Sequence, residues 1–387
     1  MPSMFIGGAE KALLGLLEAI DYSLYDISLF LYRHEGEFLS YIPETVHVLP
    51  ALNEYSNFDT PIWKVLCSRY WRFGIARIVS KIAKKIHCLC TKEHPGIWMS
   101  MQYTSRFLLP FLPPIPGEYD TGVMFLGVSD VLVKKVNAKK KIAWNHTDYE
   151  ILGPDVKYDS KVYKSIDHIV SVSPLCTSQL LKIYPELTDK AITISNISSK
   201  KMIQRLAEES IEEALNGKYK LLSVGRFSYA KNFDNIPDIC RHIRRKGIDV
   251  VWYLIGYGGD EQLIRQKIVE AGMQDYVKIL GKKENPYPYM KKCDLYVQPS
   301  RYEGKCISVV EAQVLARPVV ITAYPTAESQ LINGYDGLIV PMDNEGCANE
   351  IVKLLRDPQK MEQFSCNCGN EDYTGEKDIK IINKIMF

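Results

Sequence analysis

Hydrophobic and polar positions follow two alternating patterns along nearly the whole chain. Short runs of β-branched and aromatic residues are separated by stretches in which apolar residues recur every three or four positions. This alternation predicts an α/β protein with parallel sheets. In the second half we expect six buried strands, at residues 220–224, 250–255, 277–280, 295–298, 318–322 and 338–340. In the first half we expect strands at 25–32, 122–128, 141–145, 168–172 and 191–195, with helices that include 10–20 and 176–184.

The two series of strands are separated by residues 198–218, a highly charged stretch with helical character. We interpret it as the connection between two Rossmann-like domains, at residues 1–197 and 219–370. Domains of this kind bind ligands at the carboxyl ends of their strands. Residues 371–387 end in an apolar-rich segment, and we expect an amphipathic last helix that packs back on the body of the protein.

The first residues depart from this organisation. Gly7-Gly8 resembles a strand-to-helix turn opening the helix at 10–20, yet only six residues precede it, and Pro2 cannot donate to a sheet ladder. A central strand needs about five or six residues before such a turn. We therefore expect the first strand of this domain to be missing from the sequence. The alternative is a chain that begins with a loop.

Composition restricts the class of protein. The chain has 387 residues, of which 46% are hydrophobic and 24% charged, with a formal net charge of +2. These values exclude a disordered protein, a collagen-like rod and a disulfide scaffold. The ten cysteines form no CxxC pair, and we interpret them as reduced residues. No apolar span of 18 residues is present, so we expect an intracellular protein that does not cross the membrane.

Two glutamates carry the strongest local signal for chemistry. Glu303 follows the strand at 295–298, and Glu311 lies one turn into a helix expected at 308–316. The amides of Cys306, Ile307 and Ser308 lie near the start of that helix, where unpaired N–H groups favour an anion or a hydroxyl-rich ligand. Taken alone, the spacing of the two glutamates is weak evidence for a binding site. A solvated glutamate in a loop and another on the surface of a helix would have the same spacing.

Two further loops strengthen the interpretation. Gly225 ends the strand at 220–224 and permits close backbone approach, while Arg226 and Lys231 bring two cations to the same place. A glycine-rich loop, 256–259, follows the next strand but lacks the dinucleotide-binding spacing. Cations and carboxylates on loops at one sheet edge suit a nucleoside diphosphate that carries a hydroxylated group.

Residues 219–356 resemble the C-terminal half of family 4 glycosyltransferases, the retaining group with the GT-B fold. The matching segments are 223–226 with Lys231, 255–258, the two glutamates, and 316–322. Gly7 to Glu10 and Trp144 to Thr147 resemble the N-domain loops of the same enzymes. Segments 324–330 and 340–347 look like those of members that build bacterial surface polysaccharides, including capsules.

The resemblance implies a role for each matching residue. Arg226 and Lys231 would hold the donor diphosphate, Glu311 would bind the ribose hydroxyls, and Glu303 would bind the donor sugar. His146 would face the sugar from the N-domain. The remaining positions implied in donor binding are Gly7, Gly8, Gly225, Gly256, Gly281, Lys282, Gly304, Cys306, Ile307 and Ser308. The resemblance also implies that no metal or other cofactor is needed. Lys305 departs from the family, which often has an aromatic or small residue there, so sugar preference cannot be transferred.

Residues 64–92 form a basic segment without a single acid. Its cations are Lys64, Arg69, Arg72, Arg77, Lys81, Lys84, Lys85 and Lys92. Five aliphatic residues fall on one helical stripe among them: Ile75, Ile78, Val79, Ile82 and Ile86. Basic amphipathic helices of this kind favour an anionic membrane surface. The alternative is a packed helix with a basic solvated face. We expect no nucleic acid partner, because no known module supports one.

Together these features predict a retaining, hexosyltransferase-type glycosyltransferase, cytoplasmic and peripheral at the inner face of the plasma membrane. Its partners would be a nucleotide-sugar donor and a growing lipid-linked saccharide in bacterial surface polysaccharide synthesis. Two alternatives remain: a sugar-nucleotide epimerase, which would convert the donor with no acceptor present, and a scaffold protein that kept the fold and lost turnover. The donor base and sugar are not encoded in these patterns.

Overall fold

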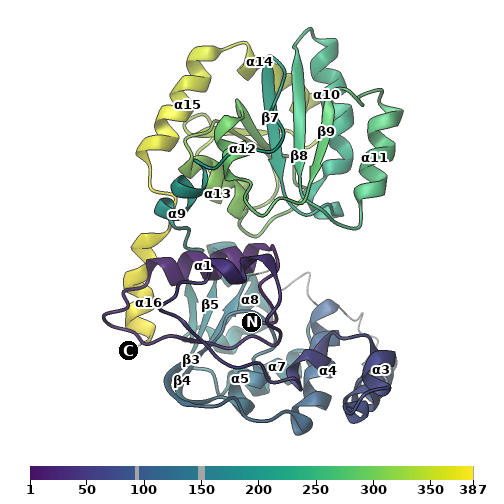
Figure 1. Ribbon diagram of the computed structural model, residues 1–387, viewed down its shortest axis with the longest axis vertical. Coiled ribbons are helices and arrows are strands. Elements are labelled where there is room, and N and C mark those ends of the chain that lie inside the picture. The colour runs from purple at the N-terminus through teal and green to yellow at the C-terminus, as the bar shows by residue number, and fades with distance from the viewer. Residues whose placement is uncertain (92–95, 147–152, 387) are drawn as a thin grey trace. The chain divides into compact units, whose positions relative to one another are not determined.

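The computed structural model describes residues 1–91, 96–146 and 153–386. The chain forms two compact units: one of Met1–Ser195 with Lys377–Phe387, the other of Asn196–Glu376 (Figure 1). Among the described helices, none is both long and apolar enough to span a bilayer.

The second unit is built on a six-stranded parallel sheet with the order β12-β11-β10-β7-β8-β9. Figure 1 labels β7, β8 and β9 of this sheet. Its strands are β7 (Tyr219–Val224), β8 (Val250–Ile255), β9 (Val277–Gly281), β10 (Leu295–Gln298), β11 (Val319–Thr322) and β12 (Gly337–Val340). All six expected strands are confirmed to within a residue. Its helices are α9 (Lys200–Leu206), α10 (Ile236–Arg245), α11 (Glu261–Glu270), α12 (Tyr287–Lys292), α13 (Ile307–Val314), α14 (Asn344–Leu355) and α15 (Pro358–Asn370).

The strand order places the candidate loops together. β7 pairs with β8 on one side and with β10 on the other, so the winding of the sheet reverses between β7 and β10. In open α/β sheets, ligands bind outside the carboxyl ends of the strands at such a reversal. Neighbouring residues Leu221 and Leu222 are both fully buried, so side chains cover both faces of the sheet there.

The first unit contains a four-stranded parallel sheet with the order β3-β4-β5-β6. Its strands are β3 (Glu118–Met124), β4 (Asn137–Asn145), β5 (His168–Ser171) and β6 (Ala191–Thr193). Its helices include α1 (Gly8–Ala19), α2 (Ile62–Leu66), α3 (Trp71–Thr91), α4 (Ile97–Leu108), α5 (Asp130–Lys135), α7 (Val156–Tyr163) and α8 (Pro174–Ile183). The expected helices at 10–20 and 176–184 are confirmed as α1 and α8.

The last helix, α16 (Ile379–Met386), belongs to this first unit although it follows the second in sequence. It buries Ile382 and Ile385, the Tyr25 hydroxyl donates to its Asn383 over 2.9 Å, and the Thr121 hydroxyl donates to its Met386 carbonyl over 2.7 Å. The expected packing of a C-terminal helix on the body is confirmed.

Two expectations in the first unit need correction. The strand expected at 25–32 is only β1 (Ser28–Leu29), which pairs with β2 (His47–Val48) outside the four-stranded sheet. Phe30 and Tyr32 instead pack their rings on Tyr55, at 4.9 and 5.2 Å between centroids. The strand expected at 122–128 is β3, which begins and ends four residues earlier.

The charged stretch 198–218 is helical only in α9. Beyond Leu206 the chain is irregular, and its acidic side chains pair with cations around α12. Lys283 lies 2.6 Å from Glu212 and 3.0 Å from Glu213, and Lys291 forms an ion pair with Glu208. Several like charges in succession disfavour a helix, whereas these tertiary partners stabilise the irregular path.

Candidate active site

The candidate site is built at the carboxyl ends of β7, β8 and β10. Backbone hydrogen bonds join the loops there: Gly225 N–H donates to Ile255, Phe227 N–H to Tyr257, and Gly256 N–H to Gly281, over 2.8 to 3.0 Å. A Cβ atom on Gly256 would overlap the carbonyl oxygen of Gly225. The glycine therefore allows the two strand ends to lie this close.

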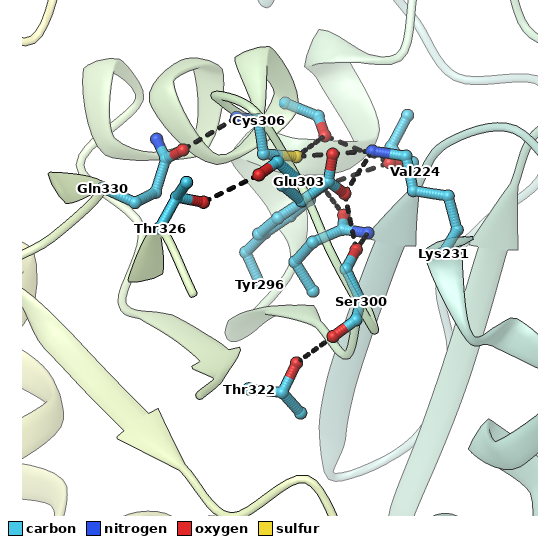
Figure 2. A network of polar contacts seen from close by, with 11 residues as sticks. Val224, Lys231, Tyr296, Ser300, Glu303, Cys306, Thr322, Thr326 and Gln330 are labelled. Carbon is cyan, nitrogen blue, oxygen red and sulfur yellow. Dashed lines mark hydrogen bonds and ion pairs between the residues drawn. The ribbon is translucent and has the colours of Figure 1, made fainter. Parts of the chain in front are cut away.

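Lys231 and Glu303 meet at this edge from segments 72 residues apart. The Lys231 ammonium donates to Oε1 of Glu303 over 2.6 Å, and it lies 3.6 Å from the sulfur of Cys306 (Figure 2). Only 19% of the Lys231 side chain and 12% of the Glu303 side chain are exposed. The sequence placed both residues at the site, and the structure brings them into direct contact.

The charges of this cluster follow from its burial. Desolvation disfavours the ammonium, but the neighbouring sulfur and the Glu303 carboxylate outweigh it and raise the pKa of Lys231. Burial, together with the Glu303 charge, raises the pKa of the Cys306 thiol. Near neutral pH Lys231 is therefore a cation and Cys306 a neutral thiol.

Arg226 follows β7 and is exposed, and it forms no ion pair with any residue that the structure describes. Arg301, which the sequence did not single out, fixes the loop that carries Lys231. Its guanidinium donates to both carboxylate oxygens of Asp234, over 3.0 and 2.8 Å, and lies 4.1 Å from the centre of the Tyr229 ring. This bidentate pair ties the loop after β7 to the loop after β10.

The start of α13 offers fewer amides than the sequence suggested. The Cys306 amide already donates to the side-chain oxygen of Gln330 over 2.8 Å (Figure 2). Among the described residues, none accepts a hydrogen bond from the amides of Ile307 and Ser308. The Ser308 hydroxyl donates to the Val224 carbonyl over 3.1 Å, which fixes α13 against the end of β7.

Glu311 lies within α13 and is 1% exposed. Its Oε1 accepts a hydrogen bond from the Tyr287 hydroxyl over 2.8 Å, a contact that spacing alone could not reveal. At the end of β9, Gly281 has a φ of +73°, a left-handed conformation that favours glycine. Next to it, the Lys282 ammonium lies 4.8 Å from the centre of the Tyr257 ring. Gly304 follows Glu303 in the loop before α13.

The remaining candidates lie in the first unit. Gly7 occupies the N-cap position of α1, and Gly8 is the first residue of that helix. His146 follows β4, and its ring lies 4.6 Å from the ring of Phe125. Thr147, which completes that predicted loop, lies outside the described residues.

The basic segment forms α2 and α3, and its apolar stripe is exposed. Ile82 and Ile86 are each 55% exposed. Leu89, which extends the same stripe by one turn, is 72% exposed. The opposite side of α3 buries Phe73, Ala76 and Ser80. The structure thus contradicts the packed-helix alternative for the stripe itself. Ile75, Ile78 and Val79 are exposed as well.

Two cations of this segment face protein groups. Arg77 is half-buried and donates to the carbonyl oxygens of Asn57 and Thr60, while Lys84 donates to the Ser100 hydroxyl over 2.7 Å. Lys64, Arg69, Arg72, Lys81 and Lys85 are exposed, and Lys92 lies outside the described residues. The guanidinium of Arg77 is therefore directed at backbone carbonyls of the protein.

The second unit is similar to a known protein family. Residues 205–368 match the family model described as glycosyl transferases group 1. The chain is 28% identical over 163 residues to the N-acetylgalactosamine-N,N'-diacetylbacillosaminyl-diphospho-undecaprenol 4-alpha-N-acetylgalactosaminyltransferase of Campylobacter jejuni, covering 42% of this chain and 44% of that protein. It is 25% identical over 170 residues to the amylovoran biosynthesis glycosyltransferase AmsD of Erwinia amylovora, covering 43% and 48%.

The fold has similar solved structures. Anabaena Alr3699/HepE in complex with UDP and glucose aligns with a TM-score of 0.65 at 17% identity, covering 99% of this chain and 98% of that one. These neighbours confirm the predicted GT-B fold. The chain spans about half the length of the curated relatives it matches. Residues 205–368 are therefore similar to group 1 glycosyltransferases, and the chain is similar to enzymes of bacterial polysaccharide biosynthesis.

Proposed function

We propose that this chain transfers a hexose-type sugar, with retention, from a nucleoside-diphosphate donor to a growing lipid-linked saccharide in bacterial surface polysaccharide synthesis. One observation carries the proposal: Lys231 and Glu303 lie 2.6 Å apart at the sheet reversal, within the residues that match the group 1 glycosyltransferase model. A cation for the diphosphate and a carboxylate for the sugar hydroxyls are thereby held together.

The proposed chemistry follows from these charges. Breaking the bond between sugar and diphosphate places negative charge on the departing phosphate oxygens. Arg226 has a free guanidinium among the described residues, and the Lys231 ammonium has a third N–H besides those directed at Glu303 and Cys306. Fixed cations at developing charge lower the barrier most when water is excluded. These two side chains can bind the diphosphate without a metal ion, and the amides of Ile307 and Ser308 add partial positive charge.

The substrate classes are supported by the relatives. Anabaena Alr3699/HepE was solved with UDP and glucose, and the Campylobacter jejuni relative carries a diphospho-undecaprenol group in its name. We propose a nucleoside diphosphate sugar, with Glu311 binding the ribose hydroxyls, and an acceptor joined to a polyprenyl diphosphate.

The test is direct. Purified protein is screened by thermal shift against nucleotide sugars, and the ligand that stabilises it is used in transfer assays. A ligand present at 100 times its dissociation constant stabilises a protein by about 2.7 kcal/mol. Arg226→Ala and Lys231→Ala should each lower turnover on the order of 10²-fold. Arg245→Ala, an exposed arginine on α10, is the matched control. Wild-type turnover in both site variants would overturn the assignment.

We further propose that α3 attaches the protein to an anionic membrane surface. Its exposed aliphatic stripe is flanked by the exposed cations Arg72, Lys81 and Lys85, which complement anionic headgroups. At about 1 kcal/mol per cation, three give reversible attachment that apolar insertion strengthens. Attachment there would place the enzyme on the bilayer that holds a lipid-linked acceptor.

Sedimentation with vesicles of phosphatidylcholine, with and without phosphatidylglycerol, tests this attachment. Lys81→Gln/Lys85→Gln should leave the protein in the supernatant, more completely as salt rises. Ile82→Asn/Ile86→Asn should do so even at low salt, because the apolar contribution is lost. Lys157→Gln/Lys161→Gln, an exposed pair at the same spacing on α7, is the matched control. Equal sedimentation of all four proteins would refute the proposal.

A further inference from the structure

Three buried polar side chains lie directly behind the candidate site. Tyr296 and Gln298 belong to β10, and Ser300 follows two residues later; all three are fully buried. The other residues of β10, Leu295 and Val297, are apolar, as expected for a central parallel strand. Burying a polar group without a hydrogen bond costs roughly 1–3 kcal/mol in proteins, so three of them in succession need partners.

A series of hydrogen bonds links them to Glu303, and the Tyr296 hydroxyl also lies 3.3 Å from the Val224 carbonyl oxygen. The Tyr296 hydroxyl lies 2.9 Å from Oε1 of Gln298, and Nε2 of Gln298 donates to the Ser300 hydroxyl over 2.9 Å. The Ser300 hydroxyl donates to Oε1 of Glu303 over 2.5 Å (Figure 2). Donors in series polarise one another, so the bond to the carboxylate is stronger than an isolated one.

The carboxylate is therefore held on one side only. Oε1 of Glu303 accepts from both Ser300 and Lys231, whereas no described residue donates to Oε2. The backbone is fixed as well, since the Thr326 hydroxyl donates to the Glu303 carbonyl over 2.8 Å and the Thr322 hydroxyl to the Ser300 carbonyl over 2.6 Å. Two bonds on one oxygen leave the other available to a ligand hydroxyl.

We propose that Ser300 and Gln298 are positioning residues, which hold the Glu303 carboxylate in one orientation and leave Oε2 for a hydroxyl of the donor sugar. This inference rests on the proposed function for its sugar ligand, but the orientation of the carboxylate does not depend on it. Neither residue touches the donor. Their effect reaches the reaction only through Glu303.

Kinetics test the role in catalysis. Ser300→Ala should lower kcat by on the order of 10-fold to 100-fold, because a misoriented carboxylate loses contacts made in the transition state. The dissociation constant for the free nucleoside diphosphate should stay within about twofold, since Arg226 and Glu311 are intact. Ser300→Thr keeps the hydroxyl and should retain most of kcat. Gln298→Met should lower kcat less than Ser300→Ala does, because Gln298 contacts Glu303 only through the Ser300 hydroxyl.

The matched control is Ser223→Ala, which also removes a fully buried hydroxyl of this sheet. Ser223 donates to the Val297 carbonyl over 2.5 Å and accepts from the Trp252 indole over 2.9 Å, with no bond to Glu303. It should lower the melting temperature as much as Ser300→Ala does while leaving kcat unchanged. An equal loss of kcat in both serine variants would mean that Ser300 acts through stability alone.

A second measurement does not depend on activity. In protein labelled with ¹³C at the glutamate carboxyl carbons, the Glu303 resonance is assigned by its loss in Glu303→Gln. It should move in Ser300→Ala and stay in place in Ser223→Ala. An unmoved resonance in Ser300→Ala, or a folded Ser300→Ala with wild-type kcat, would overturn the positioning role. A moved resonance in a protein that transfers no sugar would uphold the positioning role and refute the proposed function.

Discussion

At the residue scale, the two glutamates eight positions apart have different environments. Glu303 faces Lys231 and is partly exposed, whereas Glu311 is almost wholly buried and bonded to Tyr287. The sequence identified both carboxylates because they flank the start of a helix after a buried strand. It could not identify Tyr287 or Ser300 as partners, since side-chain contacts depend on tertiary packing. The one signal in the sequence for these buried hydrogen bonds was Gln298, an amide side chain in a strand expected to be buried.

Glu311→Gln should weaken binding of the nucleoside diphosphate by about tenfold, which corresponds to about 1.4 kcal/mol. The amide keeps the shape of the side chain and can still accept from Tyr287, but it binds ribose hydroxyls less strongly than a carboxylate. Because ribose contacts are made in the ground state and the transition state alike, kcat should change little. Calorimetric titration with UDP and GDP measures the effect, with the exposed Glu362→Gln as control. Unchanged affinity for both nucleotides would contradict the ribose assignment.

At the scale of elements, the accuracy with which each strand was predicted depended on how that strand is buried. The strands of the second unit are covered on both faces, so they are continuous apolar runs that the pattern detects. The run at 25–32 is equally aromatic, but its rings pack on Tyr55 and Phe58, outside the main sheet. A pattern of hydrophobic residues indicates that their side chains are buried, but it does not indicate which part of the protein they pack against.

Helices α4, α5 and α7 are held together by two buried carboxylates. Asp130 accepts from the hydroxyls of Ser105 and Tyr158, each over 2.6 Å, and Asp159 accepts from Trp98 and Tyr184. Burial raises the pKa of each to about 6, and the hydrogen bonds only partly oppose it. The folded protein therefore binds these protons more tightly than the unfolded chain does.

Stability of the first unit should consequently fall as the pH rises. Between the unfolded pKa, near 4, and the folded pKa, about 6, the folded state holds more protons, so raising the pH favours unfolding. From pH 5 to pH 8, each carboxylate should remove about 1–2 kcal/mol. Urea unfolding at the two pH values measures this, and Asp130→Asn should reduce the difference. The exposed Asp120→Asn is the control, because a nearby Lys139 bond lowers the pKa of Asp120 and keeps its titration below this range.

At the scale of the whole molecule, the chain leaves its first unit at Ser195 and returns to it at Lys377. The sequence predicted an amphipathic last helix, since apolar residues recur at its end. It could not assign that helix to either unit, because the contacts with Tyr25 and Thr121 join residues more than 260 positions apart. Whether the helix stabilises one unit or both is a separate physical question.

The substitution Ile382→Ala should show whether the last helix stabilises one unit or both. Ile382 is fully buried, while its neighbour Ile381 is 37% exposed. Removing a buried isoleucine side chain costs about 2–5 kcal/mol, whereas the same change at a surface position costs less than about 0.5 kcal/mol. Hydrogen exchange should therefore become faster in the amides of β3 to β6 and stay unchanged in β7 to β12. Ile381→Ala should change neither sheet. If Ile382→Ala speeds exchange in both sheets equally, the last helix supports a single cooperative structure, and the two units do not unfold independently.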